Sequence, residues 1–153
     1  MVDDSMKIYF CGAITGNKGY LESYYKIMDH LKGYGEVITE EAIRGGDWVG
    51  GLPPTGDKAV HVYERDIKWL READLIVADV TMHSIGVGFE LGFAESLGKR
   101  VLCLYNNTVG LGISAMLRGN KRTVIMEYDT IESAKRNIDK FFNNALGVRA
   151  DKS

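Results

Sequence analysis

The sequence predicts an α/β fold in which a doubly wound, mainly parallel five-stranded sheet carries helices on both faces. Strand-like and helix-like segments alternate along the 153 residues, and most of their connections are short. Several strand-like segments are apolar almost throughout, which is typical of parallel strands covered on both faces. Alternation of the two kinds of segment is typical of doubly wound sheets.

Four runs rich in apolar and β-branched residues are strong strand candidates, and a fifth run is shorter. The predicted strands cover residues 6–12, 74–80, 100–106 and 122–128, with the shorter candidate at 35–39. Between them, apolar residues recur at helical spacing. The predicted helices cover residues 19–33, 57–73, 86–97 and 130–146.

The segment 40–58 contains five of the 18 glycines and both prolines. It is too long for a simple connection, so we expect a mobile loop or lid there. No repeat or low-complexity segment divides the chain, and we expect one domain over 1–153. Residues 1–5 and 147–153 are expected to be disordered tails.

Composition excludes several classes of protein. The net charge is −2 and the pI about 5.9, which does not favour a nucleic-acid polymer as partner. We expect no membrane span, no secretory signal and a cytoplasmic location. Cys11 and Cys103 lie in apolar runs and are expected to be buried, reduced thiols. The three histidines lack metal-ligand spacing, so we expect neither a metal nor a cofactor.

Two glycine-rich stretches need a functional interpretation. Gly86-x-Gly88-x-x-x-Gly92 resembles a loose dinucleotide fingerprint, but the next predicted strand does not end in the acid that would bind a ribose. The loop 12–16 lacks the Gly-Lys-Ser/Thr of a P-loop. Two interpretations stay open. Backbone N–H groups at 12–16 and 84–88 bind an anion, or the glycines serve only to form tight turns.

Two acids are aligned with apolar faces of predicted helices, where an unused carboxylate is costly. Asp66 and Glu90 both show this pattern. The apolar residues at helical spacing are Val62, Tyr63, Trp69 and Leu70 around Asp66, and Val87, Phe93, Ala94 and Leu97 around Glu90. We therefore expect the two carboxylates to converge on one cleft, beyond the carboxyl ends of the strands.

Such a pair suits chemistry at a sugar anomeric carbon. We expect Glu90, kept ionised by a helix N-terminus, to be a nucleophile that forms a glycosyl ester. Asp66 would then protonate the leaving group and later deprotonate water. Tyr9, next to the first glycine loop, is placed to hydrogen-bond the nucleophile or the sugar. The structural alternative for Asp66 is a partly buried acid bonded to Arg65, Arg71 or a backbone N–H group.

Four segments together resemble a known family. "IYFCGAITG", "ERDIKWLREADLIVADVT", "SIGVGFELGFAESLGKRVLCL" and "SAMLRG" follow, in order, the pattern of the 2′-deoxynucleoside 5′-monophosphate N-hydrolases, which belong to the nucleoside 2-deoxyribosyltransferase superfamily. The resemblance covers about residues 7–145. It implies a flavodoxin-like fold, a homodimer with active sites at the subunit interface, and hydrolysis of the N-glycosidic bond to free base and deoxyribose 5-phosphate.

The resemblance also assigns roles to residues. It implies that Glu90 is the nucleophile, that Asp66 assists the leaving base, and that Tyr9 lies beside the sugar. Ser84 matches a phosphate-binding serine, and Ser114 matches a serine that reaches the phosphate from the neighbouring subunit. The substrate-binding residues expected from the loops and the resemblance are Gly12, Ala13, Ile14, Thr15, Gly16, Ser84, Gly86, Gly88, Ser114 and Met116.

The first loop departs from the family pattern, which often has a serine and an arginine where Ala13 and Thr15 stand. Loss of a guanidinium removes a bidentate phosphate contact. Two other functions therefore stay open. One is a deoxyribosyltransferase that passes the sugar of an unphosphorylated nucleoside to an acceptor base, and the other is a nucleotide-binding module without catalysis.

Overall fold

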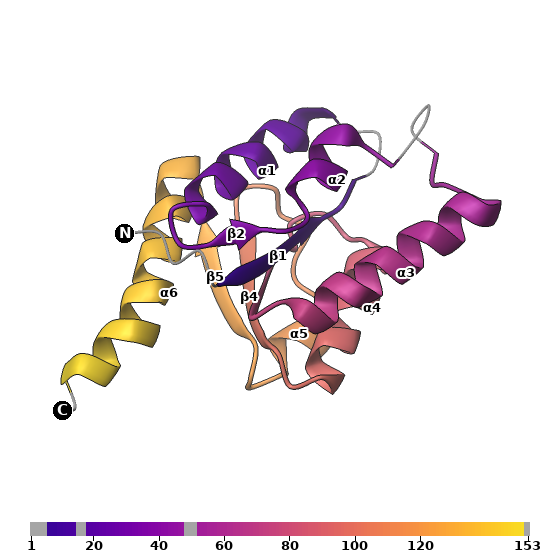
Figure 1. Ribbon diagram of the computed structural model, residues 1–153. Helices are drawn as coiled ribbons and strands as arrows, with labels where there is room; N and C mark the ends of the chain where they lie inside the picture. Colours follow the sequence, from indigo (N-terminus) through magenta and orange to yellow (C-terminus); the bar gives the residue numbers. More distant parts are fainter. Residues whose placement is uncertain (1–5, 15–17, 48–51, 152–153) are drawn as a thin grey trace.

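The computed structural model describes residues 6–14, 18–47 and 52–151, with the side chains of the last helix as far as Asn144. Its centre is a five-stranded sheet with the order β2-β1-β3-β4-β5 (Figure 1). The strands are β1 (Lys7–Gly12), β2 (Glu36–Val37), β3 (Leu75–Asp79), β4 (Arg100–Asn106) and β5 (Val124–Tyr128). Every neighbouring pair is parallel, so the predicted doubly wound sheet is confirmed.

Helices cover both faces of this sheet, as predicted. They are α1 (Lys18–Leu31), α2 (Glu40–Gly45), α3 (Gly56–Glu72), α4 (Ile85–Ser96), α5 (Ala115–Arg118) and α6 (Ile131–Asp151). Helices α1 and α6 contact each other on one side, and α3 and α4 on the other (Figure 1). Within the described residues, no helix combines the length and the apolar character needed to cross a membrane.

The alternation of side chains along β1 decides which residues reach the helices α3 and α4. Ile8 and Phe10 join the apolar core beneath α1 and α6, whereas Tyr9 and Cys11 join the core beneath α3 and α4. Tyr9 is only 1% exposed. The polar end of its side chain therefore needs a partner on the α3–α4 side.

Two predicted boundaries are wrong. The expected loop 40–58 contains α2, and its last three residues begin α3. Glu40 and Glu41 in the first turn of α2 suit the positive end of a helix dipole, and the glycines stand at its other end, where Gly46 is the C-cap with a positive φ. Helix α6 continues to Asp151 instead of giving way to a tail at 147, since one glycine inside a helix costs only about 1 kcal/mol relative to alanine. Residues 1–5 and 152–153 lie outside the described residues.

Candidate active site

The first contact of the site joins β1 to α4. The Tyr9 hydroxyl donates a hydrogen bond of 2.6 Å to Oε2 of Glu90. Glu90 occupies the second turn of α4, with Val87 and Leu91 buried beside it in the core. Of the two partners predicted for Tyr9, the nucleophile or the sugar, the structure shows the hydrogen bond to Glu90, which fixes one oxygen of this carboxylate against the sheet.

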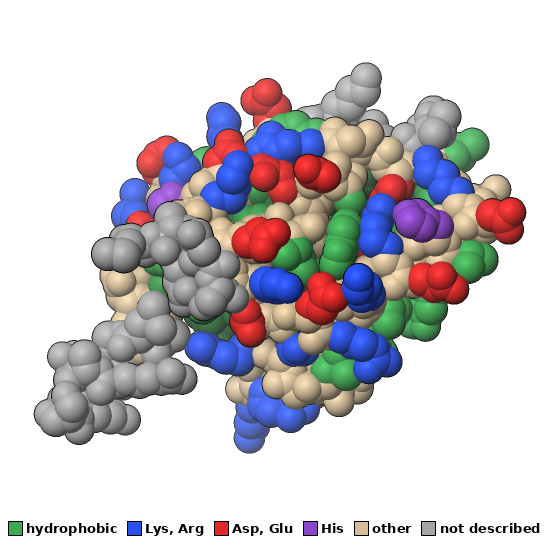
Figure 2. Space-filling view, viewed as in Figure 1, with side chains coloured by type: hydrophobic (Ala, Val, Ile, Leu, Met, Phe, Trp, Pro, Cys, Tyr) green, Lys and Arg blue, Asp and Glu red, His purple; other side chains and the backbone are tan. Residues whose placement is uncertain are grey.

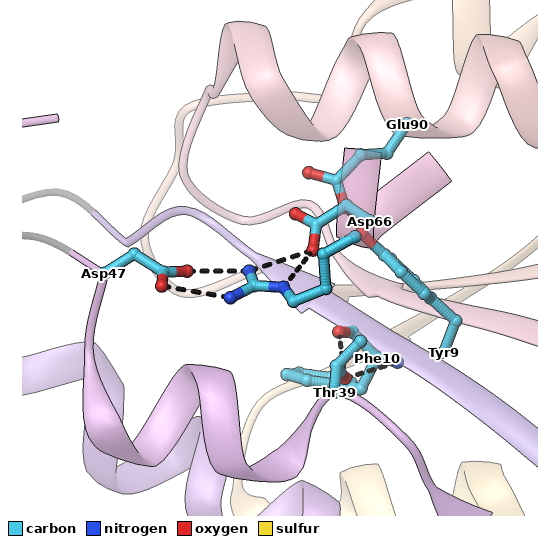
Figure 3. Close-up of polar contacts among 7 residues, drawn as sticks. Tyr9, Phe10, Thr39, Asp47, Asp66 and Glu90 are labelled. Atoms are coloured by element: carbon cyan, nitrogen blue, oxygen red, sulfur yellow. Dashed lines mark hydrogen bonds and ion pairs between the residues drawn. The ribbon is translucent and has the colours of Figure 1, made fainter. Parts of the chain in front are cut away.

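Asp66 on α3 reaches the same place from the neighbouring helix. Figure 3 shows the carboxylates of Asp66 and Glu90 turned toward one space, with Tyr9 beneath them. The residues around this space enclose a cavity of about 60 Å³, which we call the acid cavity. It is lined by Tyr9, Phe10, Cys11, Gly12, Ile14, Thr39, Ala42, Ile43, Asp47, Arg65, Asp66, Trp69 and Glu90. The predicted convergence of the two acids is thus found.

Burial controls the acidity of the pair. It raises the pKa of Glu90 to about 7, and the hydrogen bond from Tyr9 only partly offsets this effect. Burial also raises the pKa of Asp66, against the opposing influence of Arg65. The expected stabilisation of a Glu90 anion by the start of α4 does not dominate, because the carboxylate lies a turn beyond the free N–H groups.

Arg65 bridges two carboxylates at the mouth of the acid cavity. Its Nε donates to Oδ1 of Asp66 at 3.0 Å, and its two terminal nitrogens donate to the two carboxylate oxygens of Asp47 at 3.1 and 2.8 Å (Figure 3). The Arg65 guanidinium also lies over the Trp69 ring, 4.8 Å from its centre. The structural alternative for Asp66, a bond to Arg65, is therefore realised together with its place beside Glu90.

The two serines line a different cavity, of about 450 Å³, between α4 and α5. Ser84 and Ser114 cap these helices, and their hydroxyl oxygens accept hydrogen bonds from the backbone N–H groups of Val87 and Met116. Gly88 and Met116 also line this cavity.

Gly86 connects the two regions. A Cβ atom at Gly86 would lie 3.8 Å from Oε1 of Glu90 and 3.8 Å from Oγ of Ser84. The carboxylate and the hydroxyl therefore face the same open position on α4.

The first glycine loop is described only as far as Ile14. Gly12 and Ile14 line the acid cavity, while Ala13 is buried. A Cβ at Gly12 would lie 2.8 Å from Cζ of Tyr24, so close packing explains this glycine without a ligand. Thr15 and Gly16 lie outside the described residues.

Other polar groups at this end of the sheet join the loops to each other. The Thr81 hydroxyl accepts from the Asn106 N–H at 2.8 Å, and a ring nitrogen of His83 lies 3.2 Å from the Gly112 carbonyl oxygen. Both cysteines are free and buried, as predicted. Within residues 6–14, 18–47 and 52–151 we find no group of three or more His, Cys, Asp or Glu side chains arranged to hold a metal ion.

Figure 2 shows Lys and Arg side chains interspersed with Asp and Glu over the face that carries α1, α2 and α3. Neither sign of charge dominates this face, and the charged residues that line the acid cavity are Asp47, Arg65, Asp66 and Glu90.

Two residues of the site were not predicted from the sequence. Asp47 lies in the segment expected to be a loop, and only the folded chain brings it to Arg65, 18 positions away. Cys11 lines the acid cavity because β1 alternation places it on the side of Tyr9. The strand pattern contained the signal for Cys11, whereas no local pattern indicated Asp47.

Comparison with known proteins places these observations in a family. A family model described as nucleoside 2-deoxyribosyltransferase matches residues 8–134. The chain is 40% identical over 146 residues to a 5-hydroxymethyl-dUMP N-hydrolase of Tetraodon nigroviridis, covering 91% of this chain and 99% of that protein. It is 37% identical over 144 residues to the 5-hydroxymethyl-dUMP N-hydrolase of Homo sapiens, covering 88% and 78%. The resemblance noted in the sequence is confirmed.

A solved structure supports the fold. The structure of a CMP N-glycosidase of Clostridium botulinum superimposes with a TM-score of 0.58 over 87% of this chain and 98% of that one. The two sequences are 19% identical, so this likeness concerns the arrangement of sheet and helices.

Proposed function

The chain belongs to the nucleoside 2-deoxyribosyltransferase family, and from this membership and its paired acids we propose that it hydrolyses the N-glycosidic bond of (deoxy)nucleoside 5′-monophosphates. The products are the free base and (deoxy)ribose 5-phosphate. The observation that carries the proposal is the acid cavity, in which Glu90, held by Tyr9, meets Asp66. N-hydrolase relatives that match nearly the whole chain support the same reaction.

The mechanism proceeds in two displacements. An oxygen of ionised Glu90 attacks C1′ as the C1′–N bond breaks, and Asp66 gives its proton to the departing base. Asp66 then takes a proton from water, whose oxygen attacks C1′ and releases Glu90 from the glycosyl ester. Tyr9 holds Glu90 in place through the 2.6 Å hydrogen bond and leaves the other carboxylate oxygen free to attack.

The raised pKa of Glu90 has a consequence for this scheme. Reaction needs one proton on the pair, on Asp66, with Glu90 ionised. With a Glu90 pKa of about 7, the pair loses its last proton above neutral pH. Hydrolysis that depends on acid assistance is therefore expected to decline at alkaline pH, although the nucleophile is then fully ionised.

We place the 5′-phosphate of the substrate near the start of α4. Ser84 lies at the start of this helix, where backbone N–H groups attract anions. Its hydroxyl and the Glu90 carboxylate face the same position at Gly86, so a sugar lying over Gly86 reaches both. The acid cavity, at about 60 Å³, is far smaller than the roughly 300–1,000 Å³ of typical ligand pockets. The nucleotide therefore extends beyond it, and Ser84 gives the direction of its phosphate.

A panel of substrates tests the proposal. The protein is incubated with dUMP, 5-hydroxymethyl-dUMP, dCMP, dGMP and CMP, and with the matching nucleosides, each with and without a free acceptor base. We expect free base and sugar phosphate from a monophosphate without any acceptor. Product that forms only with an acceptor base, from unphosphorylated nucleosides, would instead support the transferase that the family model and the altered first loop leave open. Tight binding without any product would support a binding module.

We propose further that the active unit is a homodimer. The α3–α4 face exposes Val60, Tyr63 and Phe89, and the nearby starts of α4 and α5 expose Ile85 (95%) and Met116 (83%). The Tyr63 and Phe89 rings pack edge to face, 6.3 Å apart. Such a group of exposed apolar side chains is typical of an interaction surface. Sedimentation of the wild type and of Phe89→Glu tests this, since the variant is expected to be monomeric.

Subunit mixing tests the proposed role of Ser114. A hybrid dimer pairs one Glu90→Gln chain with one Ser114→Ala chain. If Ser114 acts in the neighbouring subunit's site, one site of the hybrid receives Glu90 from the Ser114→Ala chain and Ser114 from the Glu90→Gln chain, so mixing restores activity. If Ser114 serves its own chain, where it lines the same cavity as Ser84, the mixture stays inactive.

A further inference from the structure

Arg65 is held from three directions at the mouth of the acid cavity. Asp47 accepts hydrogen bonds from both terminal nitrogens, Oδ1 of Asp66 accepts from Nε and also lies 2.9 Å from Nη2, and the Trp69 ring lies beneath the guanidinium. The Arg65 and Asp66 side chains expose only 18% and 25% of their surface, and that of Asp47 only 22%. Such a shielded, planar and bidentate arrangement fixes the orientation of a guanidinium.

The bridge joins two parts of the chain. Asp47 follows α2, whereas Arg65 and Asp66 lie in α3. Arg65 contacts Asp47 through Nη1 and Nη2, and it contacts Oδ1 of Asp66 through Nε and the same Nη2, which lies 2.9 Å from that oxygen (Figure 3). Because Nη2 serves both carboxylates, the placement of Arg65 on a single oxygen of Asp66 depends on Asp47. Without Asp47, Nη2 is free to leave Oδ1 and bind the second oxygen of Asp66, so that Arg65 would occupy both oxygens.

We propose that Asp47 and Arg65 are a positioning pair for the proposed acid: Asp47 holds Arg65, and Arg65 orients the Asp66 carboxyl so that one oxygen stays available to the leaving base. This inference rests on the proposed function, because it assigns Asp66 the role of proton donor. Neither Asp47 nor Arg65 contacts the reacting atoms, and both act through Asp66.

The charges around Asp66 give the pair a measurable signature. Asp66 faces Arg65 and His61 on its own helix, Asp47 beyond α2, Glu90 on α4, and Tyr9 and Cys11 on β1. Arg65 lowers the pKa of Asp66, whereas the Asp47 carboxylate raises it. Loss of Arg65 and loss of Asp47 must therefore shift the titration of Asp66 in opposite directions.

The experiment compares Arg65→Gln, Arg65→Lys and Asp47→Asn with the wild type. The matched control is Arg44→Gln, because Arg44 also bridges two carboxylates, Glu40 and Asp29, and lies over an aromatic ring, but at the surface of α2. Carbon-detected NMR follows the Asp66 carboxyl group through a pH titration of the free protein. Initial rates of base release give kcat and KM for each variant, and thermal unfolding shows that each is folded.

The expected result is a rise of about one pH unit or more in the Asp66 titration midpoint of Arg65→Gln, and a fall in Asp47→Asn. We expect kcat to drop between about tenfold and 100-fold in both variants, with little change in KM, because the acid is misdirected. Arg65→Lys keeps the charge and restores the titration, but not the full kcat. The Arg44→Gln variant is expected to match the wild type.

The inference is overturned if Asp66 titrates with the same midpoint in Arg65→Gln as in a wild type that releases base. It is also overturned if Arg65→Gln and Asp47→Asn keep the wild-type kcat. A wild type that releases no base from any nucleotide would refute the proposed function itself. The NMR titration does not need activity, so the two failures are distinguishable.

Discussion

Replacement of Glu90 by glutamine is expected to stabilise the protein while it abolishes base release. Burial raises the pKa of Glu90 from 4.5 to about 7, so the folded protein holds this carboxylate ionised at a cost. A carboxyl whose pKa is higher in the folded than in the unfolded chain does not lower the free energy of unfolding at pH values below its unfolded-state pKa. As the pH rises from that value to the folded-state pKa, the carboxyl lowers the free energy of unfolding progressively. Glutamine has nearly the same shape, can still accept from Tyr9, and carries no charge.

The size of the effect follows from the shift. One pKa unit corresponds to 1.36 kcal/mol, so a change from 4.5 to about 7 corresponds to roughly 3 kcal/mol at pH 8. Well below pH 4.5 the benefit of glutamine is expected to vanish, because Glu90 is then protonated in both states. For a chain of this length, roughly 3 kcal/mol should raise Tm by about 6 to 12 °C.

Urea unfolding of wild type and Glu90→Gln at several pH values between 4.5 and 8 measures this difference. Glu22→Gln is the matched control, since Glu22 is exposed on α1 and the same change there should alter stability little at any pH. If the stability difference between wild type and Glu90→Gln does not grow with pH, Glu90 is not a desolvated carboxylate, and the electrostatic account of the site fails.

Three further results are expected. Tyr9→Phe removes the hydrogen-bond donor to Glu90, so kcat should fall about tenfold to 100-fold. The apparent pKa assigned to Glu90 should rise in the same variant, and pH–rate profiles measure both effects. Gly86→Ala should fold normally, since its Cβ makes only 3.8 Å contacts, but it should raise KM for the monophosphate. Gly45→Ala, with open space around its Cβ, is the control, and an unchanged KM for Gly86→Ala would count against the sugar position. The kcat/KM of the wild type should decline above about pH 7, and in Asp66→Asn the residual activity should lose this decline. The 5′-phosphate of the substrate titrates near pH 6, so it changes only the acid side of the pH–rate profile. The decline on the alkaline side therefore reports the ionisation of the enzyme.

Much of the fold and the centre of the site could be predicted from the sequence. Glu90 and Asp66 stood out because each lies on an apolar stripe, a pattern that local spacing reveals without tertiary information. Parallel strands bring their carboxyl ends to one edge, which is why Glu90 after β3 was one of the two partners predicted for Tyr9 on β1. Their hydrogen bond of 2.6 Å agrees with this argument.

The remainder depends on tertiary contacts. Asp47 reaches Arg65 only because α2 forms in a glycine-rich segment that predicted a loop. Gly12 suggested an anion loop, but its lack of a side chain is required by the Tyr24 ring above it. The raised pKa of Glu90 also could not be predicted, because its largest cause is burial, and the burial of this carboxylate depends on how the helices and the sheet pack around it.

Base release by wild type, Glu90→Gln and Glu22→Gln, measured side by side with the best monophosphate of the panel, tests the central claim most directly. Without an acceptor, we expect wild type and Glu22→Gln each to release one sugar phosphate for every free base. We expect Glu90→Gln to release base at least about 1,000-fold more slowly, although it is the more stable protein. A Glu90→Gln protein that releases base at the wild-type rate would contradict the assignment of Glu90 as the nucleophile.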